Sequence, residues 1–361
     1  MDILGRYYFF VGAVASCLVL MCGEAAAQND GRYLDRALPE AWEPDTLFVQ
    51  KLPVEDRWWK ELGDVRLDSL ISVAVANNYD LLEAGDRIRQ AHAVMRGEQA
   101  AYYPSVDFTA GWMRQQSSRN SSQVVIPGVS RITQYASADL SANWELDLFG
   151  SIRNRVRSEK ELYRATREDY NGVMVSLCAE VASAYAQLRT WQQQYLVAEQ
   201  HIASQQAILH ITEVRYDTGL ASQLDVSQAK SVYYSTKASL PGLEASIEQQ
   251  INAIAVLLGV YPESLRPVLR VPAPIPDYLR IVSVGIPANL LRQRPDIRAA
   301  ERTVASYAAS AGASRSDFLP KFYLKGSIGF AARDMDDFFN RKSLTYQIAP
   351  TLSWKSEAKR F

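Results

Sequence analysis

The sequence predicts an α+β protein in which long antiparallel helices are joined to four membrane-spanning β-strands. Three observations predict this class: a long helix-forming segment without proline, segments in which apolar and polar residues alternate, and a spacing that recurs along the chain. The chain has 361 residues, enough for one large domain or two ordinary ones. Its formal net charge of −1 gives no basic excess of the kind that binds nucleic acid.

The first 27 residues have the organisation of a signal peptide. An arginine precedes the mostly apolar run Tyr7–Met21, which is shorter than the roughly 20 residues that a spanning helix needs. Three processing sites compete: cleavage after the alanines at 25–27, or lipidation of Cys17 or Cys22. The choice between them stays open, with an N-terminal membrane anchor as the alternative. Three cysteines in all cannot form a disulfide scaffold.

Landmarks that recur at a fixed spacing predict a duplicated repeat. Asp80 and Pro104 bound one helical pattern, and Asp296 and Pro320 bound another. Asp80 and Asp296 are 216 positions apart, as are Pro104 and Pro320. The two helices therefore match in length without a gap, and each leads through its proline into an alternating segment.

A third pair of landmarks completes the predicted domain organisation. Trp144 and Trp354 close the later alternating segment of each copy, 210 positions apart, which fits a shorter loop in the second copy. The expected organisation is a signal peptide (1–27), an N-terminal extended segment (28–66), a first repeat of helix, two strands and helical hairpin (67–261), a proline-rich extended linker (262–287), and a second repeat that stops after its second strand (288–361).

Strict alternation predicts four long strands, each with one apolar and one polar face. The alternating segments lie at 105–112, 134–148, 322–330 and 344–354, and Pro350 in the last of them is tolerated best at an edge or bulge. They approach or exceed the roughly 9–11 residues that cross a bilayer, with a soluble sandwich as the alternative. The acidic residues of the polar face, which either line a pore or merely solvate a wet wall, are Asp107, Asp139, Glu145 and Asp147.

The segment between residues 151 and 214 predicts one very long helix, because it lacks proline and is rich in strong helix formers. A helix of this length has to pack along its length against others. The apolar residues that fall at helical spacing and predict its buried stripe are Val173, Leu177, Val181, Tyr185, Leu188 and Tyr195.

A second helix is expected to follow after a tight turn. Gly219 supplies the backbone freedom that a helix end needs, and Ser222 with Asp225 three residues later is a capping pattern. The second helix runs to about Leu258. The two helices therefore form a long hairpin with its tip near Gly219.

Five motifs point to one protein family. They are Trp58-Trp59 with Gly63 to Asp68, Trp144 to Gly150, Arg215 to Ser222 with Leu224 to Val226, Ala253 to Gly259, and Ile286-Pro287 with Leu290 to Glu301. These motifs resemble those of the TolC-like outer-membrane factors of tripartite efflux pumps, especially their NodT-type branch. The resemblance covers nearly everything from residue 55 to residue 354. It implies a homotrimer in the outer membrane with a periplasmic α-barrel.

The resemblance implies a passive channel that exports small molecules handed over by a periplasmic adaptor and an inner-membrane pump. Each subunit would give four strands to one 12-stranded barrel in the lipid of the outer membrane, and single-chain barrels begin at about eight strands. The resemblance assigns adaptor contact to the hairpin tip, which comprises Tyr216, Asp217, Thr218, Gly219, Leu220, Ala221 and Ser222.

The sequence departs from the family after Trp354, where residues 355–361 lack the proline and apolar pair that usually follow. The second long helical hairpin is missing, so we expect a C-terminally truncated product. The alternatives are a non-functional channel fragment and a periplasmic coiled-coil protein without a pore. No enzyme motif, metal site or cofactor site is found; His210 and Glu213, one helical turn apart, are too few for a metal site.

Overall fold

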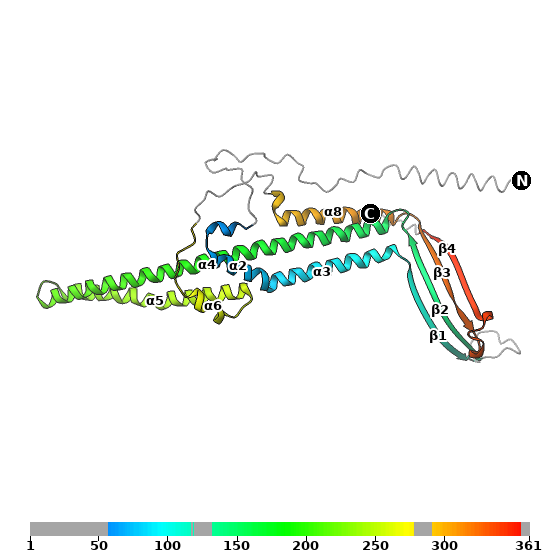
Figure 1. Ribbon diagram of the computed structural model, residues 1–361, viewed down its shortest axis with the longest axis horizontal. Coiled ribbons are helices and arrows are strands. Elements are labelled where there is room, and N and C mark those ends of the chain that lie inside the picture. The colour runs from blue at the N-terminus through cyan, green and yellow to red at the C-terminus, as the bar shows by residue number, and fades with distance from the viewer. Residues whose placement is uncertain (1–56, 117, 119–131, 278–290, 355–361) are drawn as a thin grey trace, which may run out of the picture. The chain divides into compact units, whose positions relative to one another are not determined.

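The computed structural model describes residues 57–116, 118, 132–277 and 291–354 (Figure 1). Both candidate lipidation sites, Cys17 and Cys22, lie outside the described residues. The helices are η3 (Trp58–Leu62), α2 (Val65–Asn77), α3 (Tyr79–Gln99), η4 (Ala100–Tyr102), α4 (Ser151–Asp217), α5 (Gln223–Leu258), α6 (Pro262–Leu269), α8 (Pro295–Ser316), η5 (Met335–Asp337) and η6 (Arg341–Ser343). The strands are β1 (Ser105–Gln116), β2 (Ile132–Leu146), β3 (Lys321–Ala332) and β4 (Leu344–Ser353).

Helix α4 is the element against which the other long helices pack. It has 67 residues, and its neighbours are α2, α3, α5 and α8 (Figure 1). The predicted hairpin is confirmed: α4 ends at Asp217 and α5 begins at Gln223. No helix in the described part of the chain is both long enough and apolar enough to cross a membrane.

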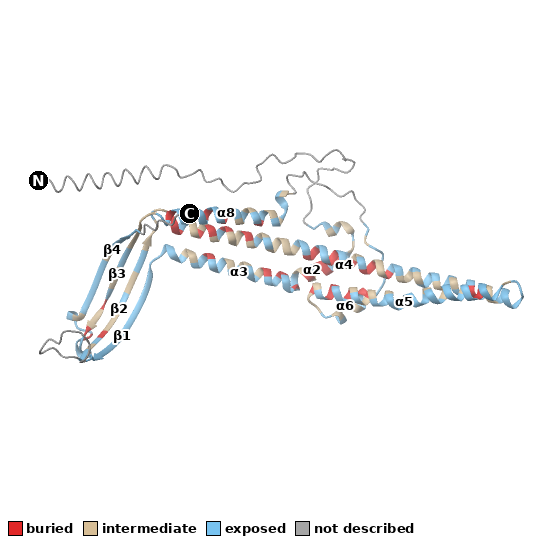
Figure 2. Cartoon of the chain, turned by 180° about the vertical axis from the view of Figure 1, so that it is seen from behind, coloured by how far each residue is buried: buried red, intermediate tan, exposed pale blue. Residues whose placement is uncertain are grey.

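The main hydrophobic core lies where α2, α4 and α5 meet, and Figure 2 shows buried residues in each of these helices. The predicted stripe of α4 is confirmed, since Leu177, Val181, Tyr185 and Leu188 are buried there. Val173 and Tyr195 are partly buried against the same cluster. Packing along this stripe stabilises a helix that propensity alone would not hold.

The hairpin tip has the capping chemistry that its sequence predicts. Gly219 adopts a left-handed backbone conformation with φ of 78°, which a residue with a side chain rarely adopts. The Ser222 hydroxyl accepts a hydrogen bond from the Asp225 amide, and the Asp225 carboxylate accepts one from the Ser222 amide. This reciprocal capping box begins α5 directly after the turn.

The four strands form one antiparallel sheet in the order β1-β2-β3-β4. Its register confirms the predicted faces, because apolar residues of neighbouring strands lie opposite one another in rows. One such row consists of Phe108, Leu140, Ile328 and Tyr346. Pro350 lies in β4, an edge strand, where the missing amide donor does least harm.

Three local expectations are wrong. The linker is not extended throughout, because Pro262 begins helix α6 at a position that needs no amide donor. The end of the N-terminal segment is helical rather than extended, because the Asp64 side chain caps α2 at Val65. The strand expected to reach residue 148 ends at Leu146, where the chain turns toward α4.

Candidate functional site

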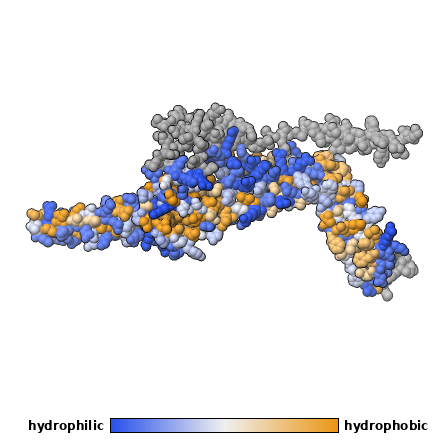
Figure 3. Space-filling view, viewed as in Figure 1, coloured by the Kyte–Doolittle hydropathy of each residue, from blue (hydrophilic) through white to orange (hydrophobic). Residues whose placement is uncertain are grey.

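The sheet presents an apolar face that the rest of the described chain leaves exposed. Phe108 is 72% exposed and Tyr346 is 78% exposed. Figure 3 shows hydrophobic residues gathered over the strands. The other large apolar side chains exposed on this face are Val106, Trp112, Ile132, Leu140, Trp144, Leu324, Ile328, Leu344, Ile348 and Leu352. Apolar patches of this kind mark a surface that contacts lipid or protein.

Both edges of the sheet are open within the described residues. β1 pairs only with β2, and β4 pairs only with β3. The outer backbone amides and carbonyls of these two strands therefore lack ladder partners. In lipid such groups have no water to bind, so an open edge is not viable there.

The opposite face of the sheet carries the predicted carboxylates Asp107 and Asp139. Asp107 is paired with Ser141, and Asp139 with Thr109, so the two acids lie on adjacent strands and on the same face. Gly329 faces Asp139 from β3, and a Cβ atom at Gly329 would lie 2.3 Å from the Asp139 Oδ1 atom. Because Gly329 has no side chain, it leaves room for the Asp139 carboxylate. In the sequence, this role is indicated only by the presence of a glycine inside a strand.

Glu145 and Asp147 have different surroundings from the other two acids. The Glu145 carboxylate lies 3.6 Å from the Lys321 ammonium group. Asp147 was expected on the polar face of the strand, and this expectation is wrong. It lies beyond β2, where its carboxylate accepts hydrogen bonds from the amides of Ile152 and Arg153 at 3.1 and 2.8 Å. A carboxylate at a helix N-terminus satisfies free amides and complements the helix dipole.

Two tryptophans join the strands to the helices in the same way in both copies of the repeat. The Trp144 indole donates a hydrogen bond to the Tyr102 carbonyl at 3.0 Å, and the Trp354 indole donates one to the Phe318 carbonyl at 3.1 Å. The two acceptors are 216 positions apart, the spacing that the sequence predicts for the repeat. The indoles therefore have a structural partner at the junction of strand and helix.

A polar cluster holds α8 and β3 against the start of α4. The Asp317 carboxylate receives a hydrogen bond from Ser151 and lies 3.4 Å from Arg155 and 2.9 Å from Lys321. Burial raises the pKa of Asp317, but the hydrogen bond and charge of Lys321, with the charge of Arg155, bring it below its ordinary value. Deeper in the same interface, the hydroxyls of Ser158 and Ser306 are 2.9 Å apart.

A second polar network, which the sequence does not reveal, lies inside the helical core. Arg189 is fully buried and donates hydrogen bonds to Gln192, to the Val271 carbonyl and to the Tyr185 hydroxyl. The Tyr185 hydroxyl in turn donates to the Asp64 carboxylate at 2.6 Å. Burial, followed by this hydrogen bond to Asp64, raises the pKa of Tyr185. The network ties the N-cap of α2 and the chain after α6 to α4.

The hairpin tip is a solvent-exposed turn with apolar side chains. Leu220 is 71% exposed, and Leu224 at the start of α5 is 65% exposed. The remaining tip residues are exposed apart from the half-buried Ala221. An exposed turn that is rigidly capped and carries apolar side chains is suited to docking against another protein.

Metal chemistry has no candidate centre among the described residues. No group of three potential ligands occurs in that part of the chain. Glu213, which shares a helical face with His210, lies 3.0 Å from Lys230 and forms an ion pair between α4 and α5.

Comparison with known proteins gives the family. The family model described as outer membrane efflux protein matches residues 70–260 and 286–355. The pyoverdine export outer membrane protein OpmQ of Pseudomonas putida is 31% identical over 84% of this chain, and the solvent efflux pump outer membrane protein SrpC of Pseudomonas putida is 32% identical over 90%. The chain spans 65% of the length of each of these two relatives.

Solved structures agree with this comparison. The outer-membrane channel OprN superimposes with a TM-score of 0.78 and 32% identity, covering 88% of this chain and 73% of that one. The open state of the MtrE outer membrane channel of Neisseria gonorrhoeae gives a TM-score of 0.66 at 25% identity, covering 90% of this chain and 73% of the other. The protein with this sheet, these helices and this hairpin therefore belongs to the outer membrane efflux protein family.

Proposed function

We propose that the protein is a channel subunit of a tripartite efflux system, located in the outer membrane with its helices extending into the periplasm. It acts as a passive conduit for small molecules and not as an enzyme. The observation that carries this proposal is the sheet, which combines an exposed apolar face with two open edges. A sheet of this kind needs lipid against its apolar face and further strands paired with both of its edges.

The channel is formed by three copies of the chain. Four strands are too few to close a barrel, since single-chain membrane barrels begin at about eight strands. Three copies would supply twelve, and each β1 edge would pair with the β4 edge of the next copy. The apolar row through Phe108 and Tyr346 would then face the lipid around the whole circumference.

Asp107, Asp139 and Glu145 line the channel in this arrangement, because the face opposite the lipid encloses the pore. Glu145 is paired with Lys321, whereas Asp107 and Asp139 have no ion-pair partner within the described residues. The two unpaired aspartates would bias the passage of charged solutes. Asp147 is not part of this proposal, because its carboxylate caps α4.

The tip from Tyr216 to Ser222 is the contact for a periplasmic adaptor, through which an inner-membrane pump delivers its solutes. Support comes from the exposure of Leu220 at a capped turn and from the relatives, which are named as export and efflux pump outer membrane proteins. The tip provides a short apolar surface without a partner inside the described chain.

The domain organisation is part of the proposal. A signal peptide at 1–27, with lipidation at Cys17 or Cys22 as the competing processing, precedes a first repeat at 67–261 and a second repeat at 288–361. The two segments matched by the family model, 70–260 and 286–355, support this division.

Membrane assembly and conductance together test the proposal. The full chain, expressed in a Gram-negative host, is expected in the outer-membrane fraction as a trimer that dissociates only on heating, and the purified trimer is expected to conduct ions across a planar bilayer. A soluble monomer in the periplasm would instead favour the coiled-coil protein without a pore. A heat-modifiable trimer without conductance would favour the non-functional channel fragment.

A further inference from the structure

Two lysines on the polar face of β3 have different surroundings. Lys321 lies 2.9 Å from the Asp317 carboxylate and 3.6 Å from the Glu145 carboxylate, so its charge is compensated. Lys325, four residues later on the same strand, is exposed and forms no ion pair within the described residues. The charge of its ammonium group is therefore available to a solute on this side of the sheet.

The register of the sheet explains why Lys325 has no carboxylate beside it. Its partners are Asn143 on β2 and Ala349 on β4, neither of which is charged. The Lys325 ammonium group lies 6.0 Å from the centre of the Tyr323 ring, which is the outer limit of a cation–π contact. Tyr323 is two residues earlier and therefore lies on the same face of the strand. The neighbours of Lys325 thus leave its charge uncancelled.

The charges on the polar face of the four strands nearly balance. The charged residues on this face are Lys321 and Lys325, with Asp107, Asp139 and Glu145, so it has two positive and three negative groups. Because Lys321 is engaged with Glu145, Lys325 is the one uncompensated cation on this face of the described strands. A neutral residue in its place would double the net negative charge of the face, from −1 to −2 per chain.

We propose that Lys325 is a specificity-determining residue of the channel, which attracts the anionic groups of passing solutes, such as carboxylates and phosphates. In the proposed channel, on which this inference rests, the polar face encloses the pore and three-fold symmetry places the Lys325 side chains of the three copies at one level. Twelve strands about 4.8 Å apart and tilted by about 40° give a barrel of about 12 Å radius.

The charge of Lys325 is felt across a barrel of this size. At 0.1 M salt, charges act over about 10 Å, which is comparable with the radius of the barrel. The aspartates on the same face would make the wall repulsive to anions. Lys325 lowers this repulsion, so solutes that carry an anionic group can pass.

Ion selectivity of the full-length trimer in a planar bilayer tests the proposal. The ratio of potassium to chloride permeability is obtained from the reversal potential across a gradient of potassium chloride, at low salt, where charges are screened least. We expect Lys325→Gln to raise this ratio at least about two-fold. Lys325→Arg keeps the charge and should retain the ratio of the wild-type channel. An unchanged or lower ratio in Lys325→Gln would overturn the proposal.

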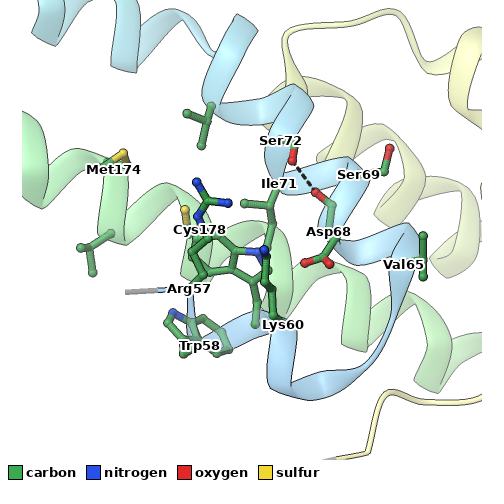
Figure 4. Close-up of a pocket in the computed structure, with 13 residues that line it drawn as sticks. Arg57, Trp58, Lys60, Val65, Asp68, Ser69, Ile71, Ser72, Met174 and Cys178 are labelled. Atoms are coloured by element: carbon green, nitrogen blue, oxygen red, sulfur yellow. Dashed lines mark hydrogen bonds between the residues drawn. The ribbon is translucent and has the colours of Figure 1, made fainter. Parts of the chain in front are cut away.

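Lys60 provides the matched control, because it is also an exposed lysine but lies in η3, outside the sheet. Figure 4 shows it among the residues that line a groove between η3, α2 and α4. Lys60→Gln removes the same charge from the chain, and we expect it to leave the permeability ratio unchanged. An equal rise in Lys60→Gln and Lys325→Gln would mean that the total charge of the protein sets the selectivity, and it would overturn the proposal.

Thiol labelling gives a second measurement that does not depend on conductance. Lys325→Cys and Leu324→Cys place thiols at adjacent positions of β3, on opposite faces of the sheet. In isolated outer membranes, an anionic methanethiosulfonate reagent should modify the Lys325→Cys variant at least about ten-fold faster, because the reactive thiolate needs water. The mass of the peptide that contains the new cysteine gives both rates. Equal rates would overturn the proposal.

The conductance measurement separates the role of Lys325 from the channel function. A wild-type trimer that does not conduct would contradict the channel function and, with it, the role of Lys325. A wild-type trimer that conducts, with the same permeability ratio in Lys325→Gln, would contradict the role of Lys325 alone.

Discussion

The helical part and the sheet of this protein differ in how far their large apolar side chains are buried within one chain. In the helical part, Tyr185, Leu188 and Ile251 are fully buried, and the buried Arg189 donates three hydrogen bonds. In the sheet, the buried apolar residues are Ala136 and Ala332, which form one small cluster with Phe338 from the connection between β3 and β4. The helices therefore have a core of their own, whereas the sheet leaves its largest apolar side chains uncovered.

The difference follows from where each element finds its hydrogen bonds. A helix satisfies its backbone internally, so α4 and α5 need partners only for their apolar side chains, and they pack on each other and on α2 in the core. A sheet satisfies its backbone through neighbours, and β1 and β4 each lack one in the described residues. The helical part therefore has a core within one chain, although α4 and α5 also expose apolar side chains such as Ile208, Ile211 and Val256, whereas the sheet needs other copies and lipid.

The largest effect is expected where this difference is greatest, on the apolar face of the sheet. Phe108→Arg places a charge on the face assigned to lipid, at about 2–4 kcal/mol per subunit near the bilayer midplane. Thr109→Arg, the next residue in β1, places the same charge on the opposite face. We expect Phe108→Arg to abolish the heat-modifiable trimer in outer membranes and Thr109→Arg to preserve it. Equal trimer yields from the two variants would mean that the faces are misassigned.

The second largest effect is expected from breaking the buried hydrogen-bond network around Arg189 in the helical part. Arg189→Ala leaves the Val271 carbonyl and the Gln192 side chain without their donor, and we expect a loss of about 3 kcal/mol in the free energy of unfolding. The control is Arg87→Ala, which removes an exposed ion pair with Glu83 and should change stability by less than about 0.5 kcal/mol. Urea unfolding followed by helical circular dichroism measures both. A loss below about 1 kcal/mol for Arg189→Ala would show that the network does not stabilise the fold.

A smaller effect is expected on the polar face of the sheet. In Gly329→Ala the new Cβ atom would meet Asp139 at 2.3 Å and the Ala138 carbonyl at 2.4 Å, so the strands have to shift at about 1–3 kcal/mol. Gly111→Ala adds the same methyl group on the same face, where nothing lies within 4 Å. We expect the temperature at which the trimer dissociates to fall by several degrees for Gly329→Ala alone. Identical dissociation temperatures for the two variants would mean that the space at Gly329 does not determine the position of Asp139.

The smallest effect is expected at the hairpin tip and depends on pH. Ser222→Ala removes the N-cap of α5, and we expect hydrogen exchange of the amides in its first turn to accelerate about five-fold. Ser227→Ala removes a hydroxyl that bonds only to a carbonyl within the helix and serves as the control. An unchanged exchange rate in Ser222→Ala would show that the turn is held by other contacts.

The pH dependence of the cap has a definite sign. Hydrogen bonds from the Ser222 amide and side chain lower the pKa of Asp225 below its ordinary value. A lowered pKa in the folded state means that the cap contributes fully above the unfolded pKa of about 3.9. The contribution is lost as the pH falls through the lower folded value. After correction for the intrinsic exchange rate at each pH, protection of the tip amides should therefore decrease below about pH 4 in the wild-type chain, with a smaller change in Ser222→Ala.

The sequence predicts those features that depend on local pattern. Alternation predicts the strands and their faces, and the pair Ser222 and Asp225 predicts the start of α5, because in both cases neighbours in sequence are neighbours in space. Asp147 was misplaced because the alternating pattern continues past Leu146, although helix α4 begins four residues after Asp147 and draws its carboxylate to the free amides. The alternating pattern alone cannot distinguish an acidic residue on the polar face of a strand from one that caps the following helix.

Features that join distant segments are not predictable in this way. In the sequence, Arg189 looks like any arginine on the surface of a helix. In the structure, its partners include a carbonyl 82 positions later. Gly329 is one of 18 glycines, and its role depends on Asp139 in another strand. Only the register between strands, or the packing between helices, identifies such residues.

The central claim is that the sheet is closed by the sheets of other copies. Disulfide scanning tests it most directly, in a chain whose native cysteines are replaced by serine. Thr109→Cys in β1 is combined in turn with a cysteine at each polar-face position of β4 from Thr345 to Thr351. Residues opposite one another in neighbouring strands are close enough to form a disulfide, so at least one pair should give a covalent species of three chains under mild oxidation. If every pair stays monomeric, or closes β1 onto β4 of the same chain, the account is contradicted.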